Sequence, residues 1–333
     1  APGVLTGTVL PGTGRHAVGG KSPLTGALAS GEAGGWWGAE CKQAGFDGVV
    51  IQGKAEKPVY LWIKDGGAEL REASHLWGLK TGDCQEEIRK ELDDEKIRVA
   101  QIGPAGENLV RFAAVMHDIN RAAGRGGLGA LMGSKNLKAV AVRGKFKVGL
   151  ADKELMKITQ KWITSNYKDM MGWAIQYGTS GSVKGNHDGG VTGIRNYQDG
   201  SLEGIEKLDA TSIFTWLIKD RDTCNRCPVR CKLVAEHLGD VYIDPRYGGP
   251  EYESIAGLGP MCQINDPLVV GKANELCAAY GLDTISTATT IACDDGSQGG
   301  TLVERQDHYY GNRFTAPCTA ARIVAASFAH AGP

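Results

Sequence analysis

The sequence predicts an α+β protein, with a mostly β first domain at residues 1–147 and a mainly helical second domain at residues 148–293. Short runs rich in β-branched and aromatic residues fill the first part. After Val148 the apolar residues recur at helical spacing. From Asp294 onward neither pattern holds, so residues 294–333 are assigned no fold. A chain of 333 residues is long enough to bury two cores.

The strands expected in the first domain are short and separated by turn residues. Asp65-Gly66-Gly67 divides two of them and has the composition of a hairpin turn. One short helix is expected among them, at residues 84–92. The expected strands are residues 48–53, 58–64, 68–72, 96–103, 111–118 and 138–144.

The second domain is expected to begin with a helix at residues 152–167, whose apolar residues recur every three or four positions. A second helix has recognisable ends. Asp266 can cap it, Pro267 suits its first turn, and Gly281 stands where a left-handed residue commonly ends a helix.

Composition narrows the classes of partner. Lys plus Arg (37) nearly balances Asp plus Glu (38), so no basic field favours nucleic acid. No run approaches the roughly 18 apolar residues of a membrane helix, so no membrane span is expected. Small-molecule partners are favoured. Nine cysteines, an odd number, indicate a metal or cluster site in a reducing compartment, and we expect a cytoplasmic protein.

The sharpest cysteine signal is "RDTCNRCPVRC", residues 221–231, which places Cys224, Cys227 and Cys231 at intervals of three and four. Three thiolates from one tight loop favour zinc or an iron–sulfur cluster. Zinc would need a paired Cys or His group elsewhere, and none stands at that spacing, which favours a [4Fe-4S] cluster. Radical-SAM enzymes have the long and short intervals reversed. Three unrelated cysteines are the plain alternative.

A glycine-rich stretch, "GRGGLG" at residues 124–129, matches the dinucleotide-binding pattern only superficially. The segment that follows is expected to turn into a strand, and no acidic residue stands about 20 positions on. The "GSK" at residues 133–135 is also not the "GK[ST]" of a P-loop, so the lysine is not at the position that binds ATP phosphates. A purely structural turn is one interpretation. The other is a loop of backbone N–H groups, at Gly124, Gly126 and Gly127, flanked by Arg121, Arg125 and Lys135, that binds a phosphorylated or anionic cofactor.

Four separate stretches together resemble the tungsten-dependent aldehyde:ferredoxin oxidoreductases. They run in order over roughly residues 1–292: residues 19–63, "NRAAGRGGLGALMGSKNLKAVAVRG" (120–144), "CNRCPVRC" (224–231) and "GPEYESIAGLG…GLDTIS" (249–286). The resemblance implies a first domain of two β-sheets that cradle a bis-pterin cofactor carrying tungsten or molybdenum. It also implies a nearby [4Fe-4S] cluster, Mg²⁺ bridging the pterin phosphates, and oxidation of aldehydes to carboxylic acids with electrons passed to ferredoxin.

The resemblance also assigns roles to residues. Arg15 matches an arginine between cluster and pterin, and Arg121 and Ala122 match the segment at the pterin phosphates and Mg²⁺. Glu32 stands where the family often has an Asn that binds Mg²⁺ through its backbone carbonyl. A backbone carbonyl is present whatever the side chain, so the substitution preserves this ligand. Asp283 matches the end of a pterin-binding motif whose opening Asp is replaced by Ala278. Glu253 matches the carboxylate beside the metal, which we expect to accept or relay a proton; without the resemblance it would be a solvated Glu at a helix end.

Parts of the family pattern are missing. The fourth cluster cysteine and a second pterin motif lie downstream of the matched region, and Cys318 is a poor substitute. The family's opening strands also precede Ala1, so we expect a fragment, a frameshifted reading or an incompletely assigned chain. Two rival functions remain: reduction of aromatic acyl-thioesters on the same scaffold, and a non-catalytic iron–sulfur module. The family often forms homo-oligomers or assemblies with ferredoxin-like subunits.

Overall fold

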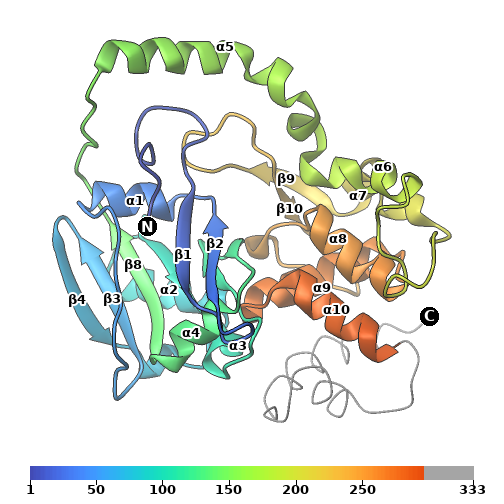
Figure 1. The fold of residues 1–333 in the computed structure, drawn as a ribbon, viewed down its shortest axis with the longest axis horizontal. Coiled ribbons are helices and arrows are strands. Elements are labelled where there is room, and N and C mark those ends of the chain that lie inside the picture. Colours follow the sequence, from blue (N-terminus) through green and yellow to red (C-terminus); the bar gives the residue numbers. More distant parts are fainter. Residues whose placement is uncertain (296–333) are drawn as a thin grey trace. The chain divides into compact units, whose positions relative to one another are not determined.

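The computed structural model describes residues 1–295 and shows a mixed α and β protein, with a multi-strand sheet in its N-terminal part and a helical C-terminal part (Figure 1). Two compact units are present. The first comprises Ala1–Ile175, Thr223–Arg230 and Ala278–Leu282, and the second comprises the remainder of the described chain. The domain boundary expected after residue 147 stays a prediction.

The first unit contains two sheets. Strands β1 (His16–Lys21) and β2 (Leu28–Ala33) form an antiparallel pair. The second sheet has six strands in the order β4-β3-β8-β5-β6-β7, of which only β3 and β8 run parallel. Its strands are β3 (Val59–Lys64), β4 (Gly67–Glu72), β5 (Arg98–Gln101), β6 (Val115–His117), β7 (Arg121–Ala123) and β8 (Leu137–Arg143).

Strand β8 is buried along almost its whole length because both faces of the large sheet are covered. Ala139 and Ala141 point to one core, which includes Tyr60 and Ile88. Val140 and Val142 point to the other core, with the buried helix residues Trp37 and Cys41. This alternation is the two-residue period of a strand, and it explains why "KAVAV" is apolar throughout.

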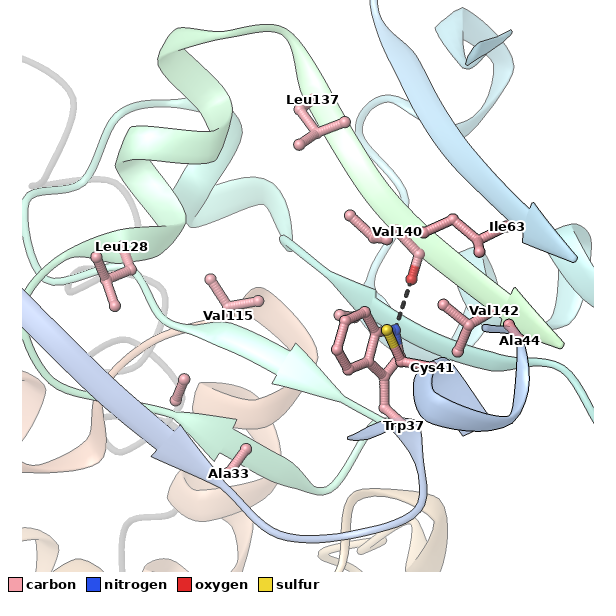
Figure 2. Close-up of a cluster of buried hydrophobic side chains, with 12 residues drawn as sticks. Ala33, Trp37, Cys41, Ala44, Ile63, Val115, Leu128, Leu137, Val140 and Val142 are labelled. Carbon is pink, nitrogen blue, oxygen red and sulfur yellow. Dashed lines mark hydrogen bonds between the residues drawn. The ribbon is translucent and has the colours of Figure 1, made fainter. Parts of the chain in front are cut away.

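Helix α1 (Trp37–Gln43) fixes the second of these cores (Figure 2). The Trp37 indole Nε1–H donates to the Val140 carbonyl at 2.9 Å, so a polar atom of a buried side chain meets a strand carbonyl. The other helices of this unit are α2 (Thr81–Glu91), α3 (Pro104–Glu107), α4 (Leu128–Ser134) and most of α5 (Lys153–Tyr177).

The second unit is mainly helical and carries one small antiparallel pair, β9 (Ile218–Asp222) and β10 (Lys232–Ala235). Its core joins buried side chains of five helices, including Ile213, Ile255 and Ala288. Its helices are α6 (Val183–Asp188), α7 (Ala210–Trp216), α8 (Tyr252–Leu258), α9 (Pro267–Tyr280, whose last turn belongs to the first unit) and α10 (Thr284–Asp295).

Several sequence predictions are confirmed and one strand is wrong. The 58–64 and 68–72 strands form a hairpin whose turn residues Asp65 and Gly66 have φ of 46° and 89°, as a type I′ turn requires. Residues 48–53, predicted as a strand, pair with nothing in the described chain. No neighbouring strand within residues 1–295 covers this apolar segment, and the Val50 side chain is 86% exposed.

No helix among the described residues is long and apolar enough to cross a bilayer.

Candidate cofactor and cluster site

The three predicted cluster cysteines lie in the loop that joins β9 to β10. The loop is internally braced: Cys227 N–H donates to the Cys224 carbonyl at 3.0 Å, and the Thr223 hydroxyl donates to the Cys227 carbonyl at 2.6 Å. Cys224, Cys227 and Cys231 are all half-buried. Within residues 1–295 no three His, Cys, Asp or Glu side chains are arranged to hold a metal ion, so ligation by this trio stays a prediction.

The first part of this loop packs on a glycine turn of the first unit. Asn225 N–H donates to the Gly35 carbonyl at 3.0 Å. A Cβ built on Gly34 would stand 2.9 Å from the Cys224 Sγ, closer than real Cβ atoms approach such neighbours. Gly34 therefore allows the Cys224 thiol to lie directly against the backbone.

Arg121, the arginine predicted to contact pterin phosphates, reaches the same loop. Its side chain is only 7% exposed, and its Nη2 donates to the Thr223 carbonyl at 2.5 Å. Its Nη1 donates to the Asn120 Oδ1 at 2.6 Å. A Cβ on Gly35 would lie 2.6 Å from the Arg121 Cδ. The structure thus brings Arg121 and the Cys224 loop together around Gly34 and Gly35.

A strained turn between β6 and β7 presents Arg121. Asp118 and Ile119 have φ of 47° and 69°, and a β-branched residue at positive φ is rare. The Asp118 carboxylate accepts the Trp36 backbone N–H at 3.2 Å through Oδ2, while its buried Oδ1 accepts no hydrogen bond from the described residues. Burial raises the pKa of Asp118, and the nearby Arg98 opposes that shift.

Two more predicted cofactor residues meet beside β1 and β2. Arg15 immediately precedes β1 and Glu32 lies on β2, and the Arg15 Nη1 stands 3.9 Å from the Glu32 Oε2. Both side chains are largely exposed, at 70% and 63%. Strand β2 lies close against β7: a Cβ built on Gly31 would be 3.2 Å from the Ala123 Cβ. Ala122, the middle residue of β7, is exposed.

The glycine-rich stretch links β7 to α4, a seven-residue helix that the sequence analysis did not anticipate. Gly126 and Gly127 have φ of 92° and 68°. A Cβ on Gly127 would lie 1.9 Å from the Arg111 carbonyl oxygen, so only glycine fits this crossing. Gly124 is half-buried, and Arg125 is exposed at the tip of the turn. Close backbone packing therefore explains part of the glycine content.

These residues suit a phosphorylated, cation-bridged cofactor. Arg15, Arg125 and the more buried Arg121 offer positive charge to phosphate groups. The orphaned Asp118 Oδ1 offers an acceptor to a cation or an N–H donor. The Arg121 guanidinium bonds the carbonyl of Thr223, the residue directly before the half-buried Cys224. Donor types suited to pterin phosphates, Mg²⁺ and an iron–sulfur cluster are thus present in the first unit, with the third cysteine, Cys231, in the second.

The remaining two predicted residues lie in the second unit, on helices that contact each other. Glu253 is exposed in the first turn of α8. Asp283 precedes α10 and is 5% exposed; its carboxylate accepts the Ile285 and Ser286 backbone N–H groups at 3.2 and 3.3 Å, so it caps that helix. The Ser254 and Thr284 hydroxyls meet at 2.9 Å between α8 and α10.

Several other cysteines are structural. Burial raises the pKa of Cys41 to about 11, and that of Cys84 and Cys277 to about 12, which keeps these thiols protonated. A protonated, enclosed thiol is a poor metal ligand. Cys318, considered as a fourth ligand, lies outside the described residues.

Sequence reasoning missed Trp36, Asp118 and Asn225, which all take part in the contacts around the cysteine loop. Trp36 stands in "GGWW" (34–37), where paired glycines before paired indoles could have indicated a close backbone approach. Asp118 and Asn225 carry no local signal, because their partners are about 80 and 190 residues away in the chain.

Comparison with known proteins gives one consistent family. The family model for the N-terminal domain of aldehyde ferredoxin oxidoreductase matches residues 1–144, and that for domains 2 and 3 matches residues 154–294. The tungsten-containing aldehyde ferredoxin oxidoreductase of Pyrococcus furiosus is 45% identical over 299 residues, which cover 88% of this chain and 48% of that protein. The Thermococcus kodakarensis protein of the same name is 44% identical over 87% of this chain.

More distant relatives share the scaffold. The WOR-like subunit of the aliphatic sulfonate oxidoreductase from Pyrococcus furiosus is 34% identical over 87% of this chain. A solved structure, the active-site complex BamBC of benzoyl coenzyme A reductase with 1,5-dienoyl-CoA, aligns with a TM-score of 0.78 and 26% identity, covering all of this chain and 56% of that one. The chain spans about half the length of the curated relatives it matches. With both family models matching in order and 45% identity to a tungsten enzyme, the chain belongs to the aldehyde ferredoxin oxidoreductase family.

Proposed function

We propose that this chain forms the cofactor-binding part of an enzyme that oxidises aldehydes to carboxylic acids at a tungsten or molybdenum bis-pterin centre. Electrons would leave through a [4Fe-4S] cluster to ferredoxin or a ferredoxin-like subunit, in a cytoplasmic homo- or hetero-oligomer. The observation that carries the proposal is the 45% identity to a tungsten-containing aldehyde ferredoxin oxidoreductase, combined with the gathering of Arg15, Glu32, Arg121 and Cys224 in one unit.

The chain's own residues would bind and orient the cofactor. Arg15, Arg121 and Arg125, with the backbone of Gly124, Gly126 and Gly127, would hold the pterin phosphates. The carbonyls of Glu32 and Ala122 would bind the bridging Mg²⁺, which prefers oxygen ligands. Cys224, Cys227 and Cys231 would hold three irons of the cluster, and Asp283 would contact a pterin.

The protein's remaining tasks are proton and electron transfer. Oxidation of an aldehyde with water yields the acid, two protons and two electrons. The metal–pterin group supplies the two-electron redox change when it is bound. Glu253 is exposed at the start of α8 and would accept one of the protons, a role for which a carboxylate is suited. Ferredoxin would take up the two electrons one at a time.

Metal analysis and a dye-linked assay of anaerobically purified full-length protein test this function. We expect tungsten or molybdenum with about four iron atoms per chain, and reduction of a viologen dye on addition of an aldehyde. Iron without tungsten or molybdenum would favour the non-catalytic iron–sulfur module. Zinc alone would contradict both.

Glu253→Gln tests the proton-transfer role. We expect at least a 100-fold fall in kcat with unchanged tungsten and iron content, because general acid–base groups contribute about 10²- to 10⁴-fold. Glu206→Gln, which changes an exposed carboxylate on another segment of the same unit, is the matched control. Near-normal turnover by Glu253→Gln would remove this residue from the reaction.

Reduction of aromatic acyl-thioesters is the second candidate function, and the benzoyl coenzyme A reductase structure with its TM-score of 0.78 favours it. The two functions differ in the direction of electron flow and in substrate. Aldehyde-dependent dye reduction supports the first. Oxidation of a reduced low-potential dye by an aromatic acyl-thioester, with no response to aldehydes, supports the second.

A further inference from the structure

Trp36 joins the cysteine loop to the turn that carries Arg121. We propose that Trp36 is a positioning residue: its indole N–H and its backbone N–H hold the Cys224–Cys227 loop and the Arg121 turn in one hydrogen-bonded arrangement. The inference rests on the proposed function in one respect only, that Cys224 and Cys227 bind a cluster.

The first contact is made by the side chain. The Trp36 Nε1–H donates to the Thr223 carbonyl at 3.2 Å, and Thr223 directly precedes Cys224. The same carbonyl accepts the Arg121 Nη2 at 2.5 Å. One carbonyl oxygen therefore connects the loop both to Trp36 and to the arginine proposed to bind pterin phosphate.

The second contact is made by the backbone. The Trp36 N–H donates to the Asp118 Oδ2 at 3.2 Å, and Asp118 begins the strained turn that presents Arg121. Residues held at positive φ persist only where their surroundings determine them, so this bond helps to keep the turn in place.

The indole ring itself is fixed from one side. The Arg98 guanidinium lies over the Trp36 ring, 5.1 Å from the ring centroid, a favourable cation–π geometry. A ring held in this way directs its N–H with little loss of side-chain entropy on bonding. A phenylalanine could keep the ring contact but could not donate to the Thr223 carbonyl.

The two glycines before Trp36 let the cysteine loop and Arg121 approach the backbone closely. Gly34 admits the Cys224 thiol and Gly35 admits Arg121, since a Cβ at either position would come within 3 Å of them. The Gly35 carbonyl also accepts the Asn225 N–H at 3.0 Å. Without the Trp36 indole N–H, the Thr223 carbonyl would lose one of its hydrogen-bond donors. The contacts at Gly34 and Gly35 supply no donor to that carbonyl.

Trp36→Phe tests the proposal, and Trp37→Phe is its matched control. Both variants remove one indole N–H···O=C bond, but Trp37 bonds Val140 in the core rather than the cysteine loop. The rate of alkylation of each cysteine is measured by mass spectrometry on the full chain after its metals are removed. Buried Cys84 reports global unfolding in the same sample. Iron content, the electron paramagnetic resonance spectrum and the reduction potential are measured on the protein with its metals.

We expect Trp36→Phe to speed alkylation of Cys224 about five-fold relative to Cys84, the effect of losing one net hydrogen bond. The spectrum or potential of its cluster should change as well, whereas Trp37→Phe should alter Cys224 and Cys84 in parallel and leave the cluster signals unchanged.

The two proposals fail separately. If the native protein holds no iron but Trp36→Phe still speeds alkylation of Cys224, the positioning role is supported and the cluster assignment is overturned. A native protein with a [4Fe-4S] cluster whose Cys224 reactivity, spectrum and potential are all unmoved by Trp36→Phe would overturn the positioning role alone.

Discussion

Gly34 illustrates how a single missing side chain shapes the candidate site. A Cβ there would stand 2.9 Å from the Cys224 Sγ. We predict that Gly34→Ala displaces the Cys224 thiol and lowers bound iron per chain at least two-fold, with a much smaller effect on the urea midpoint of unfolding. Iron analysis and urea titration measure the two effects.

Gly149→Ala is the control for that variant, because nothing lies within 4 Å of a Cβ at Gly149. It should leave iron content unchanged. Equal iron in both variants would mean that the loop can shift without loss of ligation.

His16 and His117 form a buried aromatic cluster with Trp37, in which the two imidazole centroids are 4.4 Å apart. Burial lowers the pKa of His16 to about 4, and burial together with the neighbouring His16 lowers the pKa of His117 well below 6.5. Below about pH 6.5 the unfolded chain therefore binds protons that the folded chain does not, and for His16 this holds down to about pH 4.

It follows that stability is fully present above about pH 7 and falls as the pH drops from about 6.5 toward 4. The expected slope is up to about 1.4 kcal/mol per pH unit for each histidine. Urea unfolding at several pH values measures this slope. His16→Phe should lower the slope of unfolding free energy against pH by roughly the contribution of one histidine. An unchanged slope would show that His16 is already protonated in the folded state.

At the scale of elements, the ion pair between Lys138 of β8 and Glu107 of α3 ties the large sheet to a helix in the interior. The two side chains are 0% and 3% exposed, and the Lys138 Nζ also donates to the Leu79 carbonyl at 3.0 Å. Removing one partner of a buried pair leaves an uncompensated charge.

We therefore predict that Lys138→Met lowers the free energy of unfolding by about 3–5 kcal/mol, measured by urea denaturation at neutral pH. Lys145→Met breaks a pair with Asp65 in which the lysine side chain is 72% exposed, and should cost no more than about 1 kcal/mol. Comparable losses in the two variants would show that burial does not set the strength of the inner pair.

The sequence predicted those elements whose determinants are local. The β3–β4 hairpin follows from its turn residues, and α9 follows from Asp266 and Gly281 at its ends, where the Leu268 N–H meets the Asp266 carboxylate at 2.8 Å and Gly281 has φ of 74°. Residues 48–53 have an equally good local pattern but no strand beside them. Local pattern alone therefore does not decide strand pairing.

The candidate site divides in the same way. Arg121 and the cysteine triplet could be singled out from the sequence, because family motifs carry them, and their cofactor and cluster roles stay predictions. Trp36 and Asp118 could not be predicted, because their roles depend on contacts across 82 to 187 residues of chain. Such contacts exist only once the first unit is folded.

At the scale of the whole molecule, the first unit is assembled from three separate stretches of chain. The Ala114 N–H donates to the Gly281 carbonyl at 2.8 Å, and the Thr81 hydroxyl donates to the Ala278 carbonyl at 2.9 Å. Gly103 packs so closely on Tyr280 that a Cβ there would lie 2.3 Å from its carbonyl oxygen. Residues 278–282 are therefore a structural part of a unit that begins at Ala1.

We predict that a fragment of residues 1–147 unfolds at a lower urea concentration than the same unit in the full chain. It loses five hydrogen bonds, two to Thr223 and one each to Asn225, Ala278 and Gly281, at about 1 kcal/mol each, hence roughly 5 kcal/mol. Near-ultraviolet circular dichroism of the tryptophans follows the transition. A full chain cut at a protease site introduced at exposed Gly172 is the control, because it is also interrupted yet keeps all three stretches. If the fragment were as stable as the cut chain, residues 1–147 would fold without help, and residues 223–230 and 278–282 would add nothing to the stability of the first unit.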